Sequence, residues 1–596
     1  MNICEVDRDL IWDLLWKRFP KIAFRLLYEE HARHQQMKRS WDFPSGVYEA
    51  DLLLIYGLNG SYEQLITRPR KEGLIAIFLE EDLSVLQNFL FSPLGALFLQ
   101  DLQVGLHFVE STSLLEEIFK ESIDLWGGEK IELVFPQDFS KRRAYQLKER
   151  LYYLVSYHQI SSLEALAYPI VMENVQANFA EFPSSFLVNR LQGAFRDVPA
   201  VICGAGCSLE KEAKWLRTLE HQALIFAGGS TIPALGLLGV TPHFSVAIDP
   251  NAEEFARLKK TTAFETPFLY GSRVHKEVLP VMHGRPGYIS IDSGGPLEAW
   301  IQEKLNLPVD ALQSLLGFKS FSVTTLMVPL ACYLGCNPLL FCGVDLSYQR
   351  GKQYLEGIAL PSTKLNLKEQ KKSFLEQPLQ RNNNEGKRVY TLRKWILESQ
   401  CLSGYIKQFK EVGFWNASSQ GLPIKGARCC SLEQFIKQFC QKQFDLQGQI
   451  HLALETSPLE VSLQEVKFVQ EELVASVQRC LSLFKQLMHE TEAGFFALEH
   501  PALPLKSAKW LLLEMDLEQE VAFSVCFQRF IAILDKRQQR AFFSKEFQES
   551  EAGRKAFLDK KMAVWKECEE LATYYLSSKA KKGSCIVAGM NANSNV

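Results

Sequence analysis

The sequence predicts an α/β protein with two doubly wound, Rossmann-like domains followed by an all-α helical bundle. Short apolar runs ending in glycine or polar residues recur through residues 51–135 and 200–342, which is the pattern of buried parallel strands. From Glu460 onward, apolar residues instead recur three or four positions apart, which is the pattern of amphipathic helices. At 596 residues, the chain is long enough for about three or four domains. We expect domains over 1–150, 175–440 and 445–596, with a helical linker over 151–174.

Composition limits the classes of partner and the compartment. Lys and Arg number 66 against 69 Asp and Glu, a net charge of −3, so the chain is not expected to bind nucleic acid. The 14 cysteines are scattered, which is typical of a reducing compartment, and none has the spacing of a structural zinc site. Met1–Phe19 carries charges throughout and is not a secretory signal. We therefore expect a cytoplasmic protein without a metal.

One uncharged stretch, Phe321–Val344, is long enough to span a bilayer. Pro329 and Pro338 interrupt it, and the stretch divides into a helix over Ser322–Leu334 and a strand over Leu339–Cys342. It is expected to be a buried unit of a parallel sheet, and no transmembrane segment is predicted.

The first domain shows a strand and glycine loop over Asp51–Tyr62, a helix near Glu63–Arg68, and a second strand over Gly73–Glu81. Val104–Val109 and Ile131–Phe135 add further strands. A glycine turn with an acid after the next strand is how doubly wound sheets hold a nucleoside. The region resembles the methyltransferase variant of this fold, but Asn59 stands where that pattern has a glycine. An active methyltransferase and a structural or partner-binding domain both remain open.

The central domain contains six apolar runs, each ending in small or polar residues. They are Ala200–Cys203, Ala223–Phe226, Phe244–Ile248, Phe268–Tyr270, Tyr288–Ile291 and Leu339–Cys342. The carboxyl ends of parallel strands share one edge, so the polar residues that follow are expected to meet in a single crevice.

A glycine corner follows the first of these runs. Gly204 and Gly206 allow a tight turn, and Ser208 is expected to cap the next helix. Backbone N–H groups and the positive end of the helix dipole would suit a phosphate there, although such turns also serve as simple connections. On this interpretation, Gly206→Val removes nucleotide binding and leaves the melting temperature of the free protein almost unchanged.

Two acids and one histidine are the candidates for chemistry. Asp249 and Asp345 lie at strand ends, where an acid can bind ribose or a metal, act as a general base, or only form a turn. His275 could take a proton from an attacking hydroxyl or be a surface residue. Arg273 and Lys276 could meet a phosphate or belong to a solvated loop.

The order and spacing of several motifs resemble the DUF115 family over about residues 175–430. The motifs are VPAVICGAGCSLEKEAKWL, FAGGSTIPALGLLGVTPHFSVAIDP, SFSVTTLMVPLACYLGCNPLLFCGVDLSY, Val389–Thr391 and FWNASSQGLPIKGA. The family includes motility accessory factors implicated in flagellin glycosylation and the MptE-type 6-hydroxymethylpterin diphosphokinases. The resemblance implies a central domain that is similar in fold to sialyltransferases and holds a nucleotide at its glycine corner.

The resemblance matches Gly204, Gly206, Ser208, Asp249, Ser322 and Asp345 to motifs of the family, and the strand-end loops add Ser230 and His275. The nucleotide-binding candidates are therefore Gly204, Gly206, Ser208, Ser230, Asp249 and Ser322, and the catalytic candidates are Asp345, His275 and Asp249. Cys207 departs from the family's Gly-x-Gly-Pro-Ser corner, and Ser418–Gly421 departs from an acid with paired glycines.

The resemblance implies an enzyme that moves a sugar from a nucleotide donor, a CMP-nonulosonic acid, to a serine or threonine hydroxyl of a protein acceptor. A pterin diphosphokinase using ATP and Mg²⁺ is the enzymatic alternative, and a degenerate nucleotide-binding scaffold is the other. Residues 362–388 are expected to form a mobile loop.

The helical region is expected to contain three long helices. The first runs through Val466–Phe484, the second from Trp510 through Ile531, and the third over Phe557–Tyr575.

Overall fold

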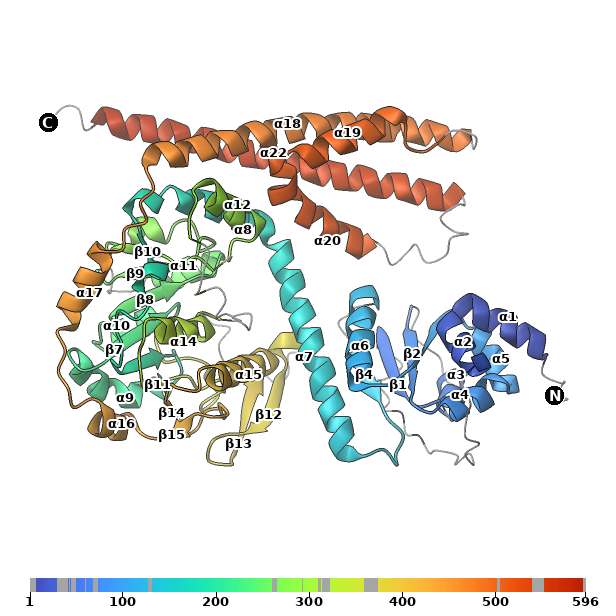
Figure 1. Ribbon diagram of the computed structural model, residues 1–596, viewed down its shortest axis with the longest axis horizontal. Coiled ribbons are helices and arrows are strands. Elements are labelled where there is room, and N and C mark those ends of the chain that lie inside the picture. Colours follow the sequence, from blue (N-terminus) through green and yellow to red (C-terminus); the bar gives the residue numbers. More distant parts are fainter. Residues whose placement is uncertain are drawn as a thin grey trace. The chain divides into compact units, whose positions relative to one another are not determined.

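The computed structural model describes residues 7–28, 41, 43, 50–58, 60–67, 73–126, 131–259, 265–291, 293–308, 312, 322–358, 374–500, 504–538 and 551–592. The chain divides into two compact units, Met1–Ser162 and Leu163–Val596, which are described separately (Figure 1). The further boundary expected at 440–445 within the second unit stays a prediction.

The first unit is built on a four-stranded parallel sheet in the order β3-β2-β1-β4. Its strands are β1 (Leu52–Tyr56), β2 (Ile75–Glu80), β3 (Val104–Phe108) and β4 (Ile131–Val134), and all four were predicted. Its helices are α1 (Arg8–Arg18), α2 (Pro20–Tyr28), α3 (Ser61–Ile66), α4 (Leu83–Leu90), α5 (Pro93–Gln100), α6 (Thr112–Trp126) and α7 (Lys141–Leu166), which runs past the unit boundary.

The two acids at the carboxyl end of β2, Glu80 and Glu81, are hydrogen-bonded or ion-paired to other groups of the protein. The buried Glu80 carboxylate accepts hydrogen bonds from the backbone N–H groups of Leu58, Glu81 and Asp82. Glu81 pairs with Arg143 and accepts the Tyr56 hydroxyl. These carboxylates hold the loops together, which favours the structural interpretation of this unit over a nucleoside site. Asn59 lies outside the described residues.

The second unit contains a nine-stranded parallel sheet in the order β15-β14-β11-β6-β7-β8-β9-β10-β5 (Figure 1). Five of the six predicted strands are present near their expected bounds, as β6 (Ala200–Cys203), β7 (Leu224–Gly228), β8 (Phe244–Ala247), β9 (Phe268–Tyr270) and β11 (Leu339–Cys342). The strand expected over Tyr288–Ile291 is instead β10 (Pro286–Tyr288), which ends at the residue where the prediction began. The short strands β5 (Phe186–Leu187), β14 (Phe414–Asn416) and β15 (Arg428–Cys429) complete the sheet at its ends.

Helices cover both faces of this sheet, because its strands are apolar on both sides. Val201 and Cys203 face a core that includes α8 (Tyr168–Phe179), α9 (Leu209–Leu216), α10 (Thr231–Leu237), α12 (Pro296–Lys304) and α16 (Leu432–Phe439). Ala200 and Ile202 face a core that includes α14 (Val323–Tyr333), α15 (Arg393–Gln408) and α17 (Leu446–Glu455). The helix α11 (Ala252–Leu258) follows β8.

The uncharged stretch near residue 330 forms the expected helix and strand, α14 and β11. Ser322 caps α14 by accepting a hydrogen bond from the Thr325 N–H group. Among the described residues, no single helix is long and apolar enough to cross a membrane. The pair α4 and α5, bent by 89° at the break between them, would be long and apolar enough together, judged by length and composition alone.

Part of the predicted mobile loop is ordered, which corrects that prediction. Residues 378–392 form an antiparallel hairpin of β12 (Pro378–Asn382) and β13 (Arg388–Leu392). The buried Asn383 side chain accepts hydrogen bonds from the Glu385 and Lys387 N–H groups and fixes the turn. Residues 362–373 lie outside the described part of the chain.

Long helices form the rest of the second unit: α18 (Leu463–Phe496), α19 (Ala508–Gln519), α20 (Gln528–Gln538) and α22 (Glu551–Ala592). Ser462 and Glu465 form a capping box at the start of α18. The predicted second helix is instead interrupted, because Glu520 is extended and a π-helical turn, Phe523–Phe527, precedes α20. Lys304 of α12 pairs with Glu472 of α18 at 2.6 Å, so these helices also contact the sheet layer.

Candidate functional site

A cavity of about 170 Å³ opens at the carboxyl edge of the nine-stranded sheet. Loops after β6, β7, β8 and β11 contribute its walls, together with the start of α14 and residues of α11 and α15. Six of the predicted site residues line it, namely Gly204, Gly206, Ser230, Asp249, Ser322 and Asp345. Ser208 and His275 do not belong to the lining. The expected convergence of strand ends therefore brings most of the candidates together.

The two corner glycines have a packing role. The strand order reverses between β6 and β11, the place where doubly wound sheets usually bind ligands. Here the loops after these strands touch each other: the Gly206 N–H group donates to the Gly343 carbonyl at 2.9 Å. A β-carbon on Gly204 would lie 2.6 Å from the same carbonyl oxygen. Glycine is required because two backbones approach closely.

Asp345 supplies an internal anion at the start of α9. Its buried carboxylate accepts the Ser208 N–H group at 3.0 Å and the Ser208 hydroxyl. The N–H groups of Gly206 and Ser208 are thus already used, and a phosphate in contact with them would meet a carboxylate of like charge. This geometry corrects the expectation that the corner is free to cradle a phosphate. A catalytic role for Asp345 stays a prediction.

A short segment after β11 crosses over the corner. The Leu355 N–H group donates to the Ala205 carbonyl at 3.0 Å, and the Cys207 thiol donates to the Tyr354 carbonyl at 3.3 Å. Tyr354 also lines the cavity. Cys207, which replaces the proline of the related motif, therefore attaches this segment to the corner.

Two glutamates in the cavity were not predicted. Burial, with the charge of Asp249 as a second cause, raises the pKa of Glu254 to about 7. Desolvation raises the pKa of Glu398 to about 7 as well. A carboxyl that titrates near neutral pH can take or give a proton there. Glu254 lies five residues after Asp249 in a helix start and could have been noticed, whereas nothing in the sequence around Glu398 marks it.

Ser322 connects the start of α14 to Glu398. Its hydroxyl accepts the Thr325 N–H group at 3.3 Å and is hydrogen-bonded to the Glu398 side chain. The nucleotide-binding role of Ser322 stays a prediction, and the contact that the structure shows is with the Glu398 side chain.

His275 lies beside the cavity without lining it. Its ring stacks on Phe255 with centroids 5.6 Å apart, and its backbone N–H group donates to the Asp249 carbonyl. Lys276 pairs with Glu173 of α8, which favours a structural role for that lysine. As the chain is folded here, His275 is less well placed for proton transfer than the two glutamates.

The charged lining is predominantly acidic. Of the residues that the structure describes, Asp249, Glu254, Asp345 and Glu398 line the cavity with a single cation, Arg257. Among the described residues, no three His, Cys, Asp or Glu side chains are grouped closely enough to hold a metal ion by themselves. An anionic ligand would need compensation, either from a cation that it brings or from protonation of the glutamates.

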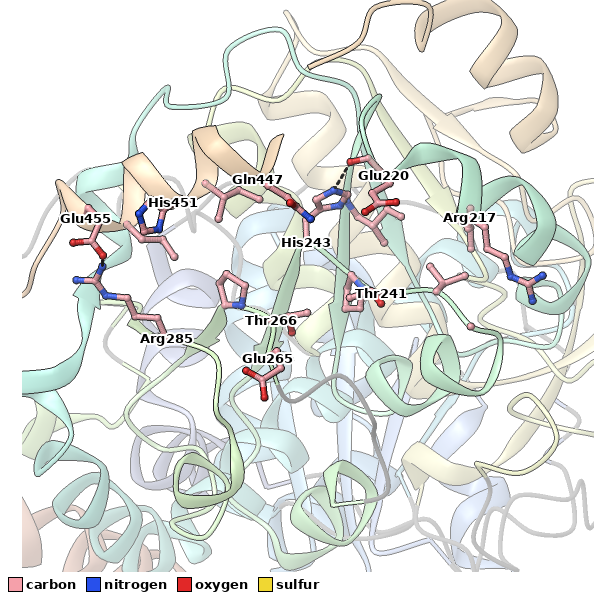
Figure 2. A pocket seen from close by; sticks show the side chains of 18 residues that line it. Arg217, Glu220, Thr241, His243, Glu265, Thr266, Arg285, Gln447, His451 and Glu455 are labelled. Atoms are coloured by element: carbon pink, nitrogen blue, oxygen red, sulfur yellow. Dashed lines mark hydrogen bonds and ion pairs between the residues drawn. The ribbon is translucent and has the colours of Figure 1, made fainter. Parts of the chain in front are cut away.

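A larger cavity, about 630 Å³, lies at the opposite, amino-terminal edge of the same strands (Figure 2). Several of its polar side chains are paired within the protein. His243 accepts the Ile225 N–H group at Nδ1 and contacts the Glu220 carbonyl through Nε2, while Arg285 pairs with Glu455 at 2.6 Å (Figure 2). Open parallel sheets bind ligands at their carboxyl edge, so the smaller cavity is the candidate site.

The second unit thus belongs to the class of doubly wound α/β proteins, with a polar cavity at the carboxyl edge of its sheet, where such sheets usually bind ligands. Residues 173–351 match the model of the family described as 6-hydroxymethylpterin diphosphokinase MptE-like, which confirms the resemblance for that part of the chain. The structure is also similar to that of MAf glycosyltransferase from Magnetospirillum magneticum AMB-1, with 12% identity, 96% of each chain covered and a TM-score of 0.49. No curated protein sequence matches the chain.

Proposed function

We propose that this protein is a glycosyltransferase-like enzyme that binds a nucleotide-activated sugar in the carboxyl-edge cavity. The observation that supports the nucleotide site most directly is the meeting of Gly204, Ser230, Asp249 and Ser322 around one cavity at the edge of a doubly wound sheet. The motif resemblance to a family that includes motility accessory factors supports transfer of a sugar. The finer proposal is a CMP-nonulosonic acid donor and a serine or threonine hydroxyl of a protein acceptor.

In this proposal, Glu398 takes the proton of the acceptor hydroxyl. Its pKa of about 7 leaves a sizeable ionised fraction at neutral pH, and Ser322 fixes its orientation. Asp249 and the loop Gly228–Thr231 contact the nucleotide, since both lie at strand ends that face the cavity. Asp345 keeps the glycine corner closed.

A pterin diphosphokinase is the second candidate, and two observations favour it. The matching family carries that name, and a cavity with four carboxylates and one guanidinium suits a nucleotide that arrives with Mg²⁺. Asp249 would then hold the metal together with the phosphates of ATP.

Thermal shift measurements with CMP, CDP, UDP, ATP with Mg²⁺ and S-adenosylmethionine separate these functions. Stabilisation by CMP, followed by transfer from a CMP-sugar to a protein hydroxyl, would support the first proposal. Stabilisation by ATP only with Mg²⁺, with release of AMP in the presence of hydroxymethyldihydropterin, would establish the second. Nucleotide binding without turnover would identify a scaffold, and stabilisation by none would remove the nucleotide site.

A further inference from the structure

One oxygen in the cavity accepts no hydrogen bond from any described group. Glu254 is 1% exposed, and its Oε2 atom accepts a hydrogen bond from Arg257 Nη2 at 3.0 Å. Its Oε1 atom is buried and has no hydrogen-bond partner within the described chain. A buried carboxylate oxygen without a donor costs free energy, so folded proteins rarely keep one unless it has a use.

The Gly229 loop packs directly beside this oxygen. Gly229, with φ of +51°, packs beside it, and a β-carbon at that position would lie 2.9 Å from Oε1. A side chain at position 229 would therefore crowd Oε1, and the Gly229 loop and Glu254 both line the cavity. The nearest charges that act on Glu254 are Arg257 on its own helix and Asp249 at the end of β8.

These contacts indicate which kind of ligand group could donate a hydrogen bond to Oε1. A phosphate or carboxylate next to Oε1 would meet like charge from Asp249 and from the ionised form of Glu254. A hydroxyl is a neutral donor and satisfies the oxygen without adding charge. Acidic side chains bind ribose hydroxyls in this way in other doubly wound folds.

We propose that Glu254 Oε1 accepts a hydrogen bond from a sugar hydroxyl of the ligand, and that Glu254 thereby selects for a sugar-bearing ligand over a simple anion. This inference rests on the proposed nucleotide site. The hydroxyl belongs either to the ribose of the nucleotide or to the sugar that the nucleotide carries, and both offer the same donor.

The test compares the full-length wild type with Glu254→Gln by calorimetric titration. The probes are CMP, 2′-deoxy-CMP, 3′-deoxy-CMP and CMP-N-acetylneuraminic acid. In the variant, the amide oxygen keeps the bond from Arg257 and turns an NH₂ donor toward the ligand. If the hydroxyl belongs to the ribose, we expect the variant to lose about tenfold or more in affinity for CMP, as for a hydrogen bond to a charged group. It should bind one deoxy analogue as well as the wild type does.

The two sources of the hydroxyl give different results. If the hydroxyl belongs to the ribose, the wild type binds one deoxy analogue more weakly than CMP, whereas the variant binds the two with equal affinity. A hydroxyl of the carried sugar leaves the binding of CMP unchanged and weakens only CMP-N-acetylneuraminic acid. Glu253→Gln, an exposed neighbour on the same helix, is the matched control and should behave like the wild type.

Stability provides an independent readout. Because Oε1 is unpartnered, Glu254→Gln should keep or raise the melting temperature of the free protein, whereas a purely structural Glu254–Arg257 pair would make it fall. Equal affinities of wild type and variant for all four probes would overturn the inference and leave the nucleotide site standing. Absence of binding in both proteins would overturn the site and the inference together. If Glu254 distinguishes CMP from its deoxy analogues but the protein transfers no sugar, only the proposed activity would be overturned.

Discussion

At the scale of single residues, the side chains that line the cavity divide into those that hold the fold and those that are available to a ligand. Asp345 accepts a hydrogen bond from the Ser208 N–H group, and Ser322 accepts one from the Thr325 N–H group, so both hold the fold. Glu254 and Glu398 titrate near neutral pH. Sequence patterns find the first kind only in part. The strand-end position marks Asp345, but Ser208, which was expected to cap α9, makes no side-chain capping bond and donates its hydroxyl to Asp345 instead. The second kind depends on burial and distant neighbours, which no local motif records.

We predict that Asp345→Asn destabilises the second unit. The amide retains one acceptor but loses the charge that the Ser208 N–H group and hydroxyl share, at a cost of about 2 kcal/mol. Urea unfolding of the full chain would measure the change. Ser208→Ala removes only the hydroxyl contact and should cost less. A variant as stable as the wild type would show that the carboxylate does not secure the corner.

The raised pKa of Glu398 predicts a pH-dependent stability. The unfolded carboxyl titrates near its ordinary value of 4.5, and the folded one near 7. Between these values the folded state holds a proton that the unfolded state has released, so the contribution is complete below 4.5 and is lost as pH rises through 7. Relative to Glu398→Gln, the wild type should therefore lose several degrees of melting temperature between pH 5 and 8. A constant difference would contradict the assignment; Glu253→Gln is the control.

At the scale of elements, the β6 corner shows why the fold was easier to predict than the site. Apolar runs with glycine ends predicted β6 and β11, and both strands lie within the expected bounds. Their adjacency in the sheet brings Gly204 against Gly343, a contact between residues far apart in sequence. The same glycines that suggested a phosphate loop are needed for this packing.

We predict that Gly204→Ala lowers the melting temperature of the free protein by several degrees. The new β-carbon would lie 2.6 Å from the Gly343 carbonyl oxygen, so backbone must move. Gly413→Ala is a suitable control, since its β-carbon would meet Pro338 at an ordinary 3.4 Å. By the same reasoning, Gly206→Val is now expected to destabilise the free protein, contrary to the expectation from sequence. Equal melting temperatures for Gly204→Ala and Gly413→Ala would show that the two loops can separate.

At the scale of the whole molecule, the chain forms two compact units whose sheets do not share strands. Composition and strand spacing predicted both sheets, and helical periodicity predicted the long carboxyl-terminal helices. The interruption at Glu520 could not be foreseen, because residues on either side keep the helical apolar pattern.

We predict that a fragment comprising residues 167–596 folds and binds the same nucleotide as the full chain. Every residue that lines the carboxyl-edge cavity lies in the second unit, as do the cores on both faces of its sheet. Circular dichroism and the nucleotide thermal shift would test this. A folded fragment that no longer responds to nucleotide would show that the first unit contributes to binding.

The Asp345 carboxylate at the start of α9 has a consequence for the protein's surroundings. Inorganic phosphate and sulfate compete for any exposed helix start in a cell, and a site that relied on bare N–H groups would be partly filled by them. Here the Asp345 carboxylate already occupies that position, so free phosphate or sulfate would find the Ser208 N–H group engaged and would bind the corner weakly. On the proposed function, a ligand must instead be recognised by its sugar and nucleoside rather than by its charge.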